Sequence, residues 1–194
     1  MSRTASVTRA TKETDITVEL NLDGSGASRS DTGIPFFDHM LQQLGKHAGW
    51  DLDVTCKGDL QVDGHHTVED CGIALGAALA EALGDKAGIR RFASITVPLD
   101  EAAVEVFLDL AGRNFVVHEV AVPYETIDGF DTGLLEDFVR AFAQAASMTI
   151  HVHLRAGRSP HHICEAQFKA MAKALGDGCS LTGRGDVPST KGTL

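Results

Sequence analysis

The sequence has no long apolar run, no paired-cysteine motif and no low-complexity stretch. No segment approaches the roughly 18 consecutive apolar residues that a membrane-spanning helix requires. The N-terminal stretch, MSRTASVTRATKE, lacks the apolar centre of a secretion signal. The four cysteines, at positions 56, 71, 164 and 179, form neither a CxxC pair nor a zinc-finger spacing. We therefore expect a cytoplasmic protein whose thiols are reduced.

Positive charge is also scarce, because the formal net charge is −10 and the pI is near 5.2. A general nucleic-acid binder needs a positive surface to displace counterions, so we expect no nucleic-acid partner. A small phosphorylated ligand is compatible with this balance, since a few arginines or lysines can form a local positive pocket. The 194 residues, 43% hydrophobic and 23% charged, suit one globular domain or two tightly joined half-domains.

The chain contains an internal repeat. Asp31-Thr32-Gly33 and Asp131-Thr132-Gly133 each open a segment with a helix-like pattern, followed by an alternating strand pattern. The series continues with two His-His-x-x-Glu segments, at residues 65–69 and 161–165, and with Ala-rich helix patterns that end at Leu-Gly-Asp. Such an ordered series of matches indicates the duplication of one α+β unit.

We predict an α+β fold of two half-repeats, residues 1–92 and 93–194, joined in one compact unit, each half a small sheet with helices on one face. Period-2 runs predict strands at Ile16–Leu22, Trp50–Lys57, Val104–Leu110, Phe115–Val120 and Met148–Arg155. Apolar residues at helical spacing predict four helices, marked by Phe37, Met40, Leu41 and Leu44, by Ile73, Leu75, Leu79 and Leu83, by Leu134, Leu135, Phe138 and Phe142, and by Phe168, Met171 and Leu175. Helix ends are predicted at Gly84 and Gly176, which makes the last helix about one turn shorter than its counterpart. The segment 86–127 lacks a helical pattern and is expected to link the halves.

The two His-His-x-x-Glu segments are the strongest candidates for function. If each segment begins a helix, its first histidine and its glutamate share one face, and its second histidine is rotated by about 100°. Each segment then offers a chelating pair to one ion and a single ligand to another, so two segments can complement each other around two ions. Imidazole and carboxylate together suit manganese, iron or zinc. A lone His-His pair is more often a capping or surface feature, but duplication with glutamate at the same offset favours a metal site.

The remaining histidines divide less cleanly. His39 and His47 lie on the polar face of the first helix pattern, and His151 and His153 point to the non-core face of an alternating strand. His118 receives no role. No HExxH motif occurs, and the Glu-x-x-His order of ferritin-like sites is reversed here.

Several segments together match a known family pattern. These are Arg9–Thr14, Phe36–Leu41, His65–Asp70, Asp100-Glu101, His161–Ala166, Phe168-Lys169 and Ser189–Gly192. They closely resemble imidazoleglycerol-phosphate dehydratase, and the resemblance covers essentially the whole chain. The doubled His-His-x-x-Glu is highly specific to this family.

The resemblance implies a ribosomal-S5-like two-layer fold, two Mn2+ ions per active site, and a homo-oligomer of 24 subunits with sites shared between chains. It implies one ion near His39, His66, His161 and Glu165, and the other near His65, Glu69 and His162. The family commonly has a further histidine ligand in the third helix, in a Glu-His-Phe-Phe context. This chain has Glu136-Asp137-Phe138 there, and the repeat places Asp137 in the position of His39. Asp137 can bind manganese directly or through water, so it remains a candidate ligand whose role this departure leaves open.

The resemblance also implies the substrate-binding residues. Phosphate contacts are expected from Arg91, Arg113, Lys169, Ser189 and Lys191, because phosphate recognition uses charge-assisted contacts. The other substrate-binding candidates are Glu13, His39, Gln43, His47, His65, His66 and Glu69. The catalytic candidates are Glu13, Glu69 and Glu165, and Asp70 could also take part in proton transfer.

The implied reaction is the dehydration of D-erythro-imidazole glycerol phosphate to imidazole-acetol phosphate in L-histidine biosynthesis. It breaks a C–O bond next to the imidazole ring and a C–H bond that no carbonyl acidifies. The ring must therefore supply the push, and two metals that stabilise an imidazolate make this feasible. An acid must protonate the leaving hydroxyl and a base must take the proton. Two other classes compatible with the same residues are a dinuclear metallohydrolase and a non-catalytic metal-binding assembly protein.

Overall fold

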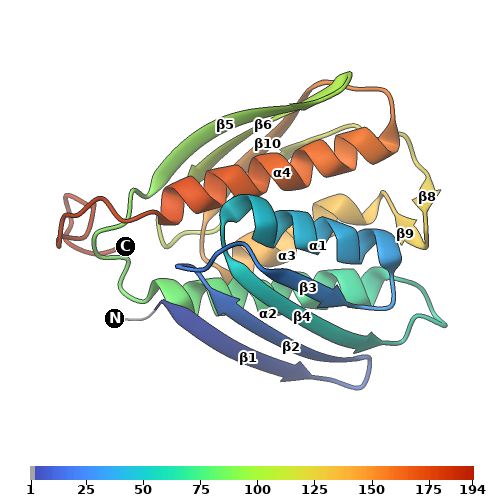
Figure 1. The fold of residues 1–194 in the computed structure, drawn as a ribbon, viewed down its shortest axis with the longest axis horizontal. Helices are drawn as coiled ribbons and strands as arrows, with labels where there is room; N and C mark the ends of the chain where they lie inside the picture. The colour runs from blue at the N-terminus through green and yellow to red at the C-terminus, as the bar shows by residue number, and fades with distance from the viewer. Residues whose placement is uncertain (1–2) are drawn as a thin grey trace.

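The structure is a computed structural model that describes residues 3–194, and in this range the chain forms two four-stranded sheets and four helices (Figure 1). The first half contains β1 (Thr4–Ala10), β2 (Thr14–Asn21), β3 (Ser28–Asp31), α1 (Pro35–Ala48), β4 (Asp51–Gly58) and α2 (His65–Leu83). The second half contains β5 (Phe92–Leu99), β6 (Ala102–Asp109), β7 (Phe115–Glu119), α3 (Leu134–Ala145), β10 (Thr149–Ala156) and α4 (Pro160–Cys179). A small hairpin of β8 (Thr126–Ile127) and β9 (Phe130–Asp131) precedes α3.

The two halves have the same topology. The strand orders are β1-β2-β4-β3 and β5-β6-β10-β7, and in both sheets only the last pair is parallel. Each strand of the four-stranded sheets and each helix of one half therefore has a counterpart at the same place in the other, and the β8–β9 hairpin is an addition to the second half. This agreement confirms the duplicated α+β architecture predicted from the repeat.

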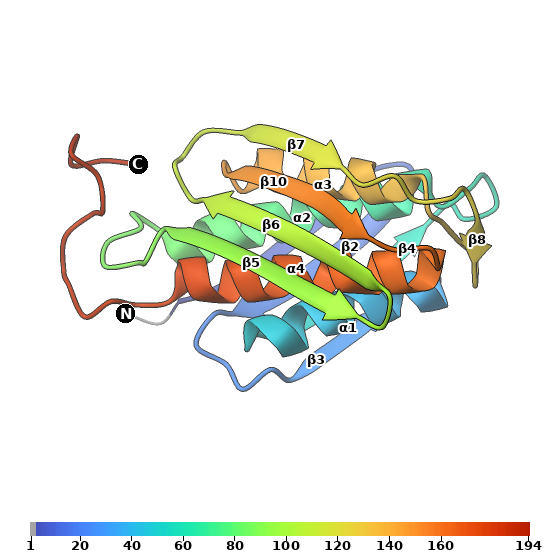
Figure 2. The same ribbon diagram turned by 90° about the horizontal axis from the view of Figure 1, so that it is seen from above.

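The helices lie between the two sheets (Figures 1 and 2). The first sheet packs against α1 and α2, the second against α3 and α4, and the layers meet through the pairs α1–α4 and α2–α3. Each sheet thus has its helices on one face, as predicted. In β4 the side chains of Leu52, Val54 and Cys56 are buried against the helices, and Ile150 and Val152 of β10 are buried in the same way.

The five predicted strands are confirmed to within two residues, but three strands of the four-stranded sheets and the two-residue strands β8 and β9 were missed. β1, β3 and β5 are edge strands of their sheets. β3 has the sequence Ser-Arg-Ser-Asp, without an apolar residue, and β1 alternates only weakly. An edge strand is held largely by backbone hydrogen bonds to its neighbour, so its side chains carry a weaker pattern. The segment 86–127 is consequently more than a link, because it contributes three strands of the second sheet, and β5 begins at Phe92.

One predicted helix end is confirmed and the other is wrong. α2 ends at Leu83 with Gly84 as its C-cap, at φ 54°. α4 continues past Gly176 to Cys179, so its 20 residues do not make it shorter than α2, which has 19. A Cβ at Gly176 would lie 2.7 Å from the carbonyl oxygen of Ala48. This glycine therefore permits α1 to end against α4, and it does not terminate a helix.

Within residues 3–194 no helix combines the length and the apolar character that a membrane crossing requires. The four cysteines are buried and free. Burial raises the pKa of the Cys164 and Cys179 thiols to about 12, which keeps both groups protonated and unreactive.

Candidate active site

The two His-His-x-x-Glu segments form the first turns of α2 and α4. The backbone N–H of His65 donates to the Asp63 carboxylate over 2.8 Å. At the start of α4, Pro160 occupies the first turn and the Ser159 hydroxyl accepts from the N–H of His162. These local interactions begin each helix so that its first histidine and its glutamate lie one turn apart on one face.

The second segment is joined by a histidine from α1. His161 Nε2 lies 3.2 Å from Glu165 Oε2, and His39 Nε2 lies 3.9 Å from the same oxygen. Lys169, one turn further along α4, approaches the other oxygen of Glu165 to 2.7 Å. Burial would raise the pKa of Glu165, but the interactions with Lys169, His39 and His161 together outweigh it, and the pKa is held below its ordinary value. We call His39, His161 and Glu165 the α4 triad.

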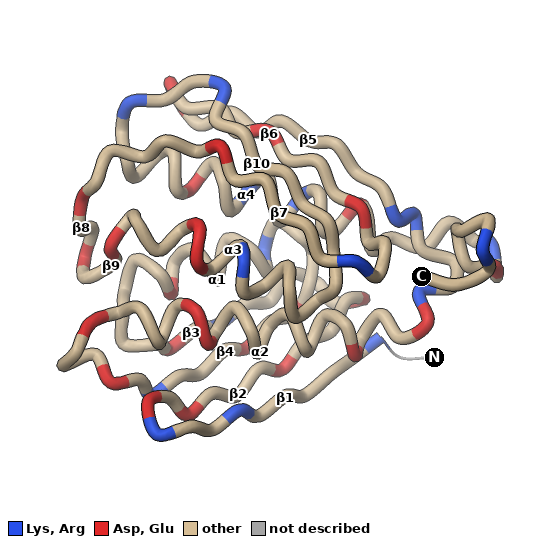
Figure 3. The backbone as a smooth tube through the Cα atoms, turned by 180° about the vertical axis from the view of Figure 1, so that it is seen from behind, with Lys and Arg blue, Asp and Glu red and all other residues tan. Residues whose placement is uncertain are grey.

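The first segment is joined by a carboxylate from α3 in the equivalent arrangement. His65 Nε2 lies 3.6 Å from Glu69 Oε2, and His65 Nδ1 lies 3.8 Å from Asp137 Oδ2. We call Asp137, His65 and Glu69 the α2 triad. The structure therefore places Asp137 beside His65, at the place that corresponds to His39 in the first half. Acidic residues are frequent at this end of the molecule, around β8, β9 and the start of α3 (Figure 3).

The second histidine of each segment lies beside the turn between the first two strands of its half, β1–β2 or β5–β6. Asp59 accepts from His66 Nδ1 over 3.1 Å, and Glu13 Oε1 lies 3.8 Å from His66 Nε2. Hydrogen bonding to Asp59 raises the pKa of His66. With Nδ1 oriented in this way, Nε2 is left to face outward, as is common for histidines that bind metals.

His162 has the equivalent surroundings in the second half. Its Nδ1 lies 2.7 Å from Glu101 Oε2, and its Nε2 lies 3.8 Å from Asp100 Oδ2. Hydrogen bonds from His162 and from the backbone N–H of Ser159 lower the pKa of Glu101 to about 2, and Glu101 raises the pKa of His162. Sequence reasoning gave no role to Asp59 or Glu101; the general need of a metal-binding histidine for an oriented second nitrogen is the signal that could have found them.

One chain thus divides the predicted ligands into two triads and two outward-facing histidines. It brings together His39, His161 and Glu165, whereas His66 contacts Asp59 and Glu13. Likewise it joins His65 to Glu69, whereas His162 contacts the turn at residues 100–101. Within residues 3–194 no group of three or more His, Cys, Asp or Glu side chains is arranged closely enough to hold an ion.

A row of polar side chains extends from His39 along α1. Gln43 Nε2 lies 3.4 Å from His39 Nε2, and Gln43 Oε1 lies 2.7 Å from His47 Nε2. Burial and the nearby Lys169 lower the pKa of His47, so its ring is neutral at pH 7. A hollow of about 290 Å³ opens beside His39 and Gln43. A larger hollow of about 830 Å³ over the first sheet contains none of the predicted site residues.

Four of the five predicted phosphate-binding residues line one pocket of about 670 Å³, formed with the C-terminal segment; they are Arg91, Arg113, Ser189 and Lys191. Arg91 pairs with Asp109 over 2.7 Å and donates to the Pro188 carbonyl over 2.8 Å, which ties the C-terminal segment to the second sheet. Lys169 is the exception, because it lies against Glu165.

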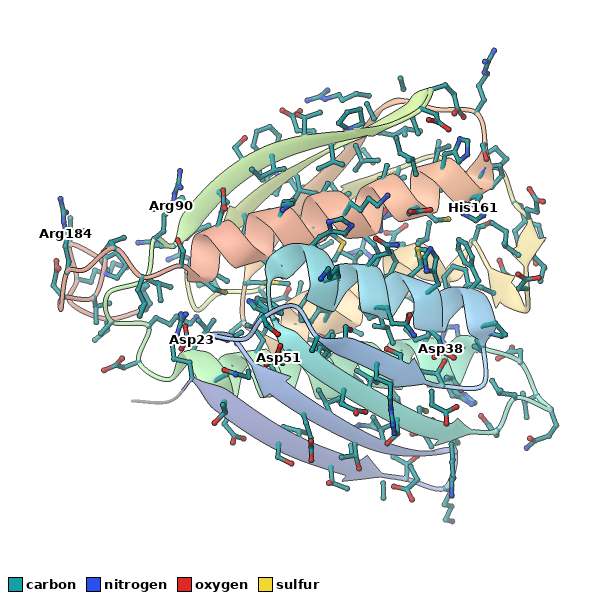
Figure 4. All side chains as sticks on the ribbon, viewed as in Figure 1. Asp23, Asp38, Asp51, Arg90, His161 and Arg184 are labelled. Carbon is teal, nitrogen blue, oxygen red and sulfur yellow. The ribbon has the colours of Figure 1, made fainter. Side chains whose placement is uncertain are left out.

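The pocket of Arg91, Arg113, Ser189 and Lys191 and the α4 triad lie toward opposite ends of α4. His161 is at its start, whereas the N–H of Arg91 donates to the Gly178 carbonyl in its last turn. Figure 4 shows this separation, with His161 at one end of the helix and Arg90 near the other. At 1.5 Å per residue, the stretch of α4 from His161 and Glu165 to Gly178 places the two sets about 20–25 Å apart along the helix.

Comparison with known proteins decides the family. The sequence model of imidazoleglycerol-phosphate dehydratase matches residues 32–175. The imidazoleglycerol-phosphate dehydratase of Frankia casuarinae is 54% identical over the full length of both chains, and that of Acidothermus cellulolyticus is 54% identical over 99% of this chain and 93% of its own. The chain belongs to the imidazoleglycerol-phosphate dehydratase family.

Solved structures of imidazoleglycerol-phosphate dehydratases have the same fold. The crystal structure from Staphylococcus aureus superposes with a TM-score of 0.83 at 32% identity, covering 92% of this chain and 99% of that one. The structure from Pyrococcus furiosus, in complex with (S)-C348, superposes with a TM-score of 0.84 at 36% identity, covering 97% of this chain and all of that one. As a member of this family the chain is a hydro-lyase of histidine biosynthesis.

Proposed function

We propose that the chain dehydrates D-erythro-imidazole glycerol phosphate to imidazole-acetol phosphate through a metal-stabilised imidazolate, with two Mn2+ ions per active site. The observation that carries this proposal is the pair of triads, each with a histidine and a glutamate one turn apart at a helix start and a third donor from a neighbouring helix. The enzyme would act in the cytoplasm, where its buried thiols stay reduced.

The donor set fits manganese. The α4 triad would hold one ion together with His66 of another copy of the chain. The α2 triad would hold the other ion together with His162 of another copy. Each triad mixes imidazole and carboxylate donors, which suit Mn2+, and each outward-facing histidine already has its Nδ1 oriented by a carboxylate. Bound ions would supply the charge that stabilises the substrate ring after it loses a proton.

The chain's own side chains would then move protons and hold the phosphate. Electron density from the ring would expel the neighbouring hydroxyl, which leaves as water when an acid protonates it. A base would then take the proton from the adjacent carbon, and the enol that results would become the ketone. Glu13 is the candidate acid or base, because its carboxylate is beside His66 and its side chain is 53% exposed. Glu165 and Glu69 serve mainly as ligands in this scheme. The pocket lined by Arg91, Arg113, Ser189 and Lys191 offers the charge-assisted contacts that a phosphate requires.

The separation of these parts supports a site shared between copies of the chain. A three-carbon link between ring and phosphate cannot bridge about 20–25 Å, so one chain would not supply both the triad and this pocket to one substrate. His66 and His162 would also come from a neighbouring copy. We propose a homo-oligomer of 24 subunits in which each active site combines residues of different copies.

The experiment is to add Mn2+ to purified metal-free protein with imidazole glycerol phosphate and to measure the ketone product. We expect turnover only with metal, and a loss of about 100- to 10,000-fold in Glu13→Gln, which removes a proton-transfer group. Glu69→Gln and Glu165→Gln should lose activity while the fold is retained. Release of inorganic phosphate would indicate a metallohydrolase, and assembly without turnover would indicate a non-catalytic metal-binding protein. Either result would overturn the proposal.

A further inference from the structure

Asp70 is a buried carboxylate that belongs to neither triad. It lies on α2 four residues after His66, so the two side chains share a face of the helix. The Asp70 side chain is only 9% exposed, and its Oδ2 accepts from Arg9 Nη1 over 2.6 Å and from the Thr14 hydroxyl over 2.5 Å. Buried in this way, it cannot reach a substrate, so any part in proton transfer must be exerted through other residues.

The two partners of Asp70 flank the turn that carries Glu13. Arg9 is near the end of β1 and Thr14 is the first residue of β2. Inside the turn, the Thr11 hydroxyl accepts from the backbone N–H groups of both Glu13 and Thr14 over 3.0 Å. The turn is therefore held at its base by Asp70 and braced internally by Thr11.

The helix that anchors the turn also carries the histidine that Glu13 faces. Glu13 Oε1 is 3.8 Å from His66 Nε2, and the Glu13 carbonyl accepts from the N–H of Asp59, whose carboxylate orients His66. Since His66 and Asp70 are one turn apart on a rigid helix, the Asp70 contacts determine how far the Glu13 carboxylate stands from that histidine.

The corresponding turn of the second half, between β5 and β6, is held by a different residue. Ala166 stands where Asp70 stands in the first half, so no carboxylate is available there to anchor the β5–β6 turn. Instead the Glu101 carboxylate accepts from the N–H groups of Ser159 and Arg158 and contacts His162. The Glu101 carboxylate is thus used to hold backbone N–H groups, whereas the Glu13 carboxylate is not needed for this purpose because Asp70 anchors its turn.

We propose that Asp70, acting through Thr14 and Arg9, is the positioning residue that holds Glu13 in its reactive place. This inference rests on the proposed role of Glu13 in the dehydration. A displacement of about 1 Å of a reacting group can cost about 100-fold in rate, so loosening this turn should act on kcat. Arg9 also compensates the buried charge of Asp70.

The test compares Thr14→Val with Thr14→Ser in the assembled, manganese-loaded enzyme. Valine has a similar shape but no hydroxyl, whereas serine keeps the donor to Asp70. We expect Thr14→Val to lower kcat about 10- to 100-fold while KM changes less than about twofold and manganese content is unchanged. Thr14→Ser should recover most of kcat. A wild-type kcat in Thr14→Val, or an equal loss in both variants, would overturn the inference.

A second measurement does not depend on turnover. Amide hydrogen exchange of residues 11–14 should become faster in Thr14→Val and in Asp70→Asn than in the wild type, because the first variant removes the donor to Asp70 and the second removes the charge that holds Arg9. Unchanged exchange would refute the anchor even if activity fell. In contrast, a fully active Glu13→Gln with faster exchange in the anchor variants would refute the role of Glu13 and leave the anchor intact, so the two failures can be told apart.

Discussion

Two inactive variants of this chain should restore each other's activity when they assemble together. Glu165→Gln changes a proposed metal ligand in the α4 triad, and Arg113→Ala removes a cation from the proposed phosphate pocket toward the other end of α4. About 20 Å of α4 separates Glu165 from Gly178, which Arg91 of the same pocket contacts, so in the proposed shared site the two positions come from different copies. Each homogeneous variant carries its lesion in every site and should be nearly inactive.

The magnitude follows from how the copies combine. If each site takes its triad from one copy and its phosphate pocket from another, random assembly of equal amounts leaves about one quarter of the sites without a lesion. The mixed oligomer should therefore have about one quarter of the wild-type kcat per site, with a wild-type KM in those sites. A site built within one chain would give no recovery, because every chain carries a lesion.

The assay is co-expression of the two variants with different affinity tags, purification through both tags, and measurement of ketone formation with saturating Mn2+. The matched control is a mixture of Arg113→Ala with Lys191→Ala, whose positions line the same pocket. That mixture should show no recovery, because every pocket carries one lesion. Activity of the Glu165→Gln and Arg113→Ala mixture no higher than the mean of its two components would refute shared sites.

Three further outcomes test the packing, a buried histidine and the altered ligand. Gly76→Ala should lower the free energy of unfolding by about 1–3 kcal/mol, since a Cβ there would lie 2.5 Å from the carbonyl oxygen of Phe142 in α3. The control Gly185→Ala, where a Cβ meets nothing within 4 Å, should change it by less than about 0.5 kcal/mol. Equal effects of the two variants in chemical denaturation would contradict this prediction. Burial lowers the pKa of His118, whose side chain is only 4% exposed, so the unfolded chain takes up the proton more readily than the folded one. The stability of the protein should therefore fall as the pH drops below the ordinary histidine value of 6.5. The unfolding midpoint should fall less steeply between pH 7 and 5 in His118→Gln, and parallel curves for the two proteins would rule out this contribution. Asp137→Ala should weaken Mn2+ binding about 10- to 100-fold in calorimetric titration, with Asp137→His closer to the wild type, and unchanged affinity in the alanine variant would exclude Asp137 as a ligand.

The sequence by itself determined the parts of this protein that depend on local geometry. The duplication, the alternating strands β2, β4, β6, β7 and β10, and the four helices follow from periodicity, which a regular element imposes on its own residues. The shared face of His65 and Glu69, and of His161 and Glu165, follows from the 3.6-residue turn of a helix in the same way. The edge strand β3 escapes this reasoning, because it is unpaired on one side and its residues are all polar, so it carries no alternating pattern.

Only the tertiary structure decided which distant residues meet. His39 and Asp137 reach their triads because α1 packs on α4 and α3 packs on α2. Gly176 is a glycine within α4 because the end of α1, at Ala48, packs directly against it. Asp59 and Glu101 orient the second histidines, and Asp70 anchors the turn of Glu13, through contacts between elements far apart in the chain. The physical reason is that spacing along one element fixes angles within that element, whereas contacts between elements depend on how their surfaces pack.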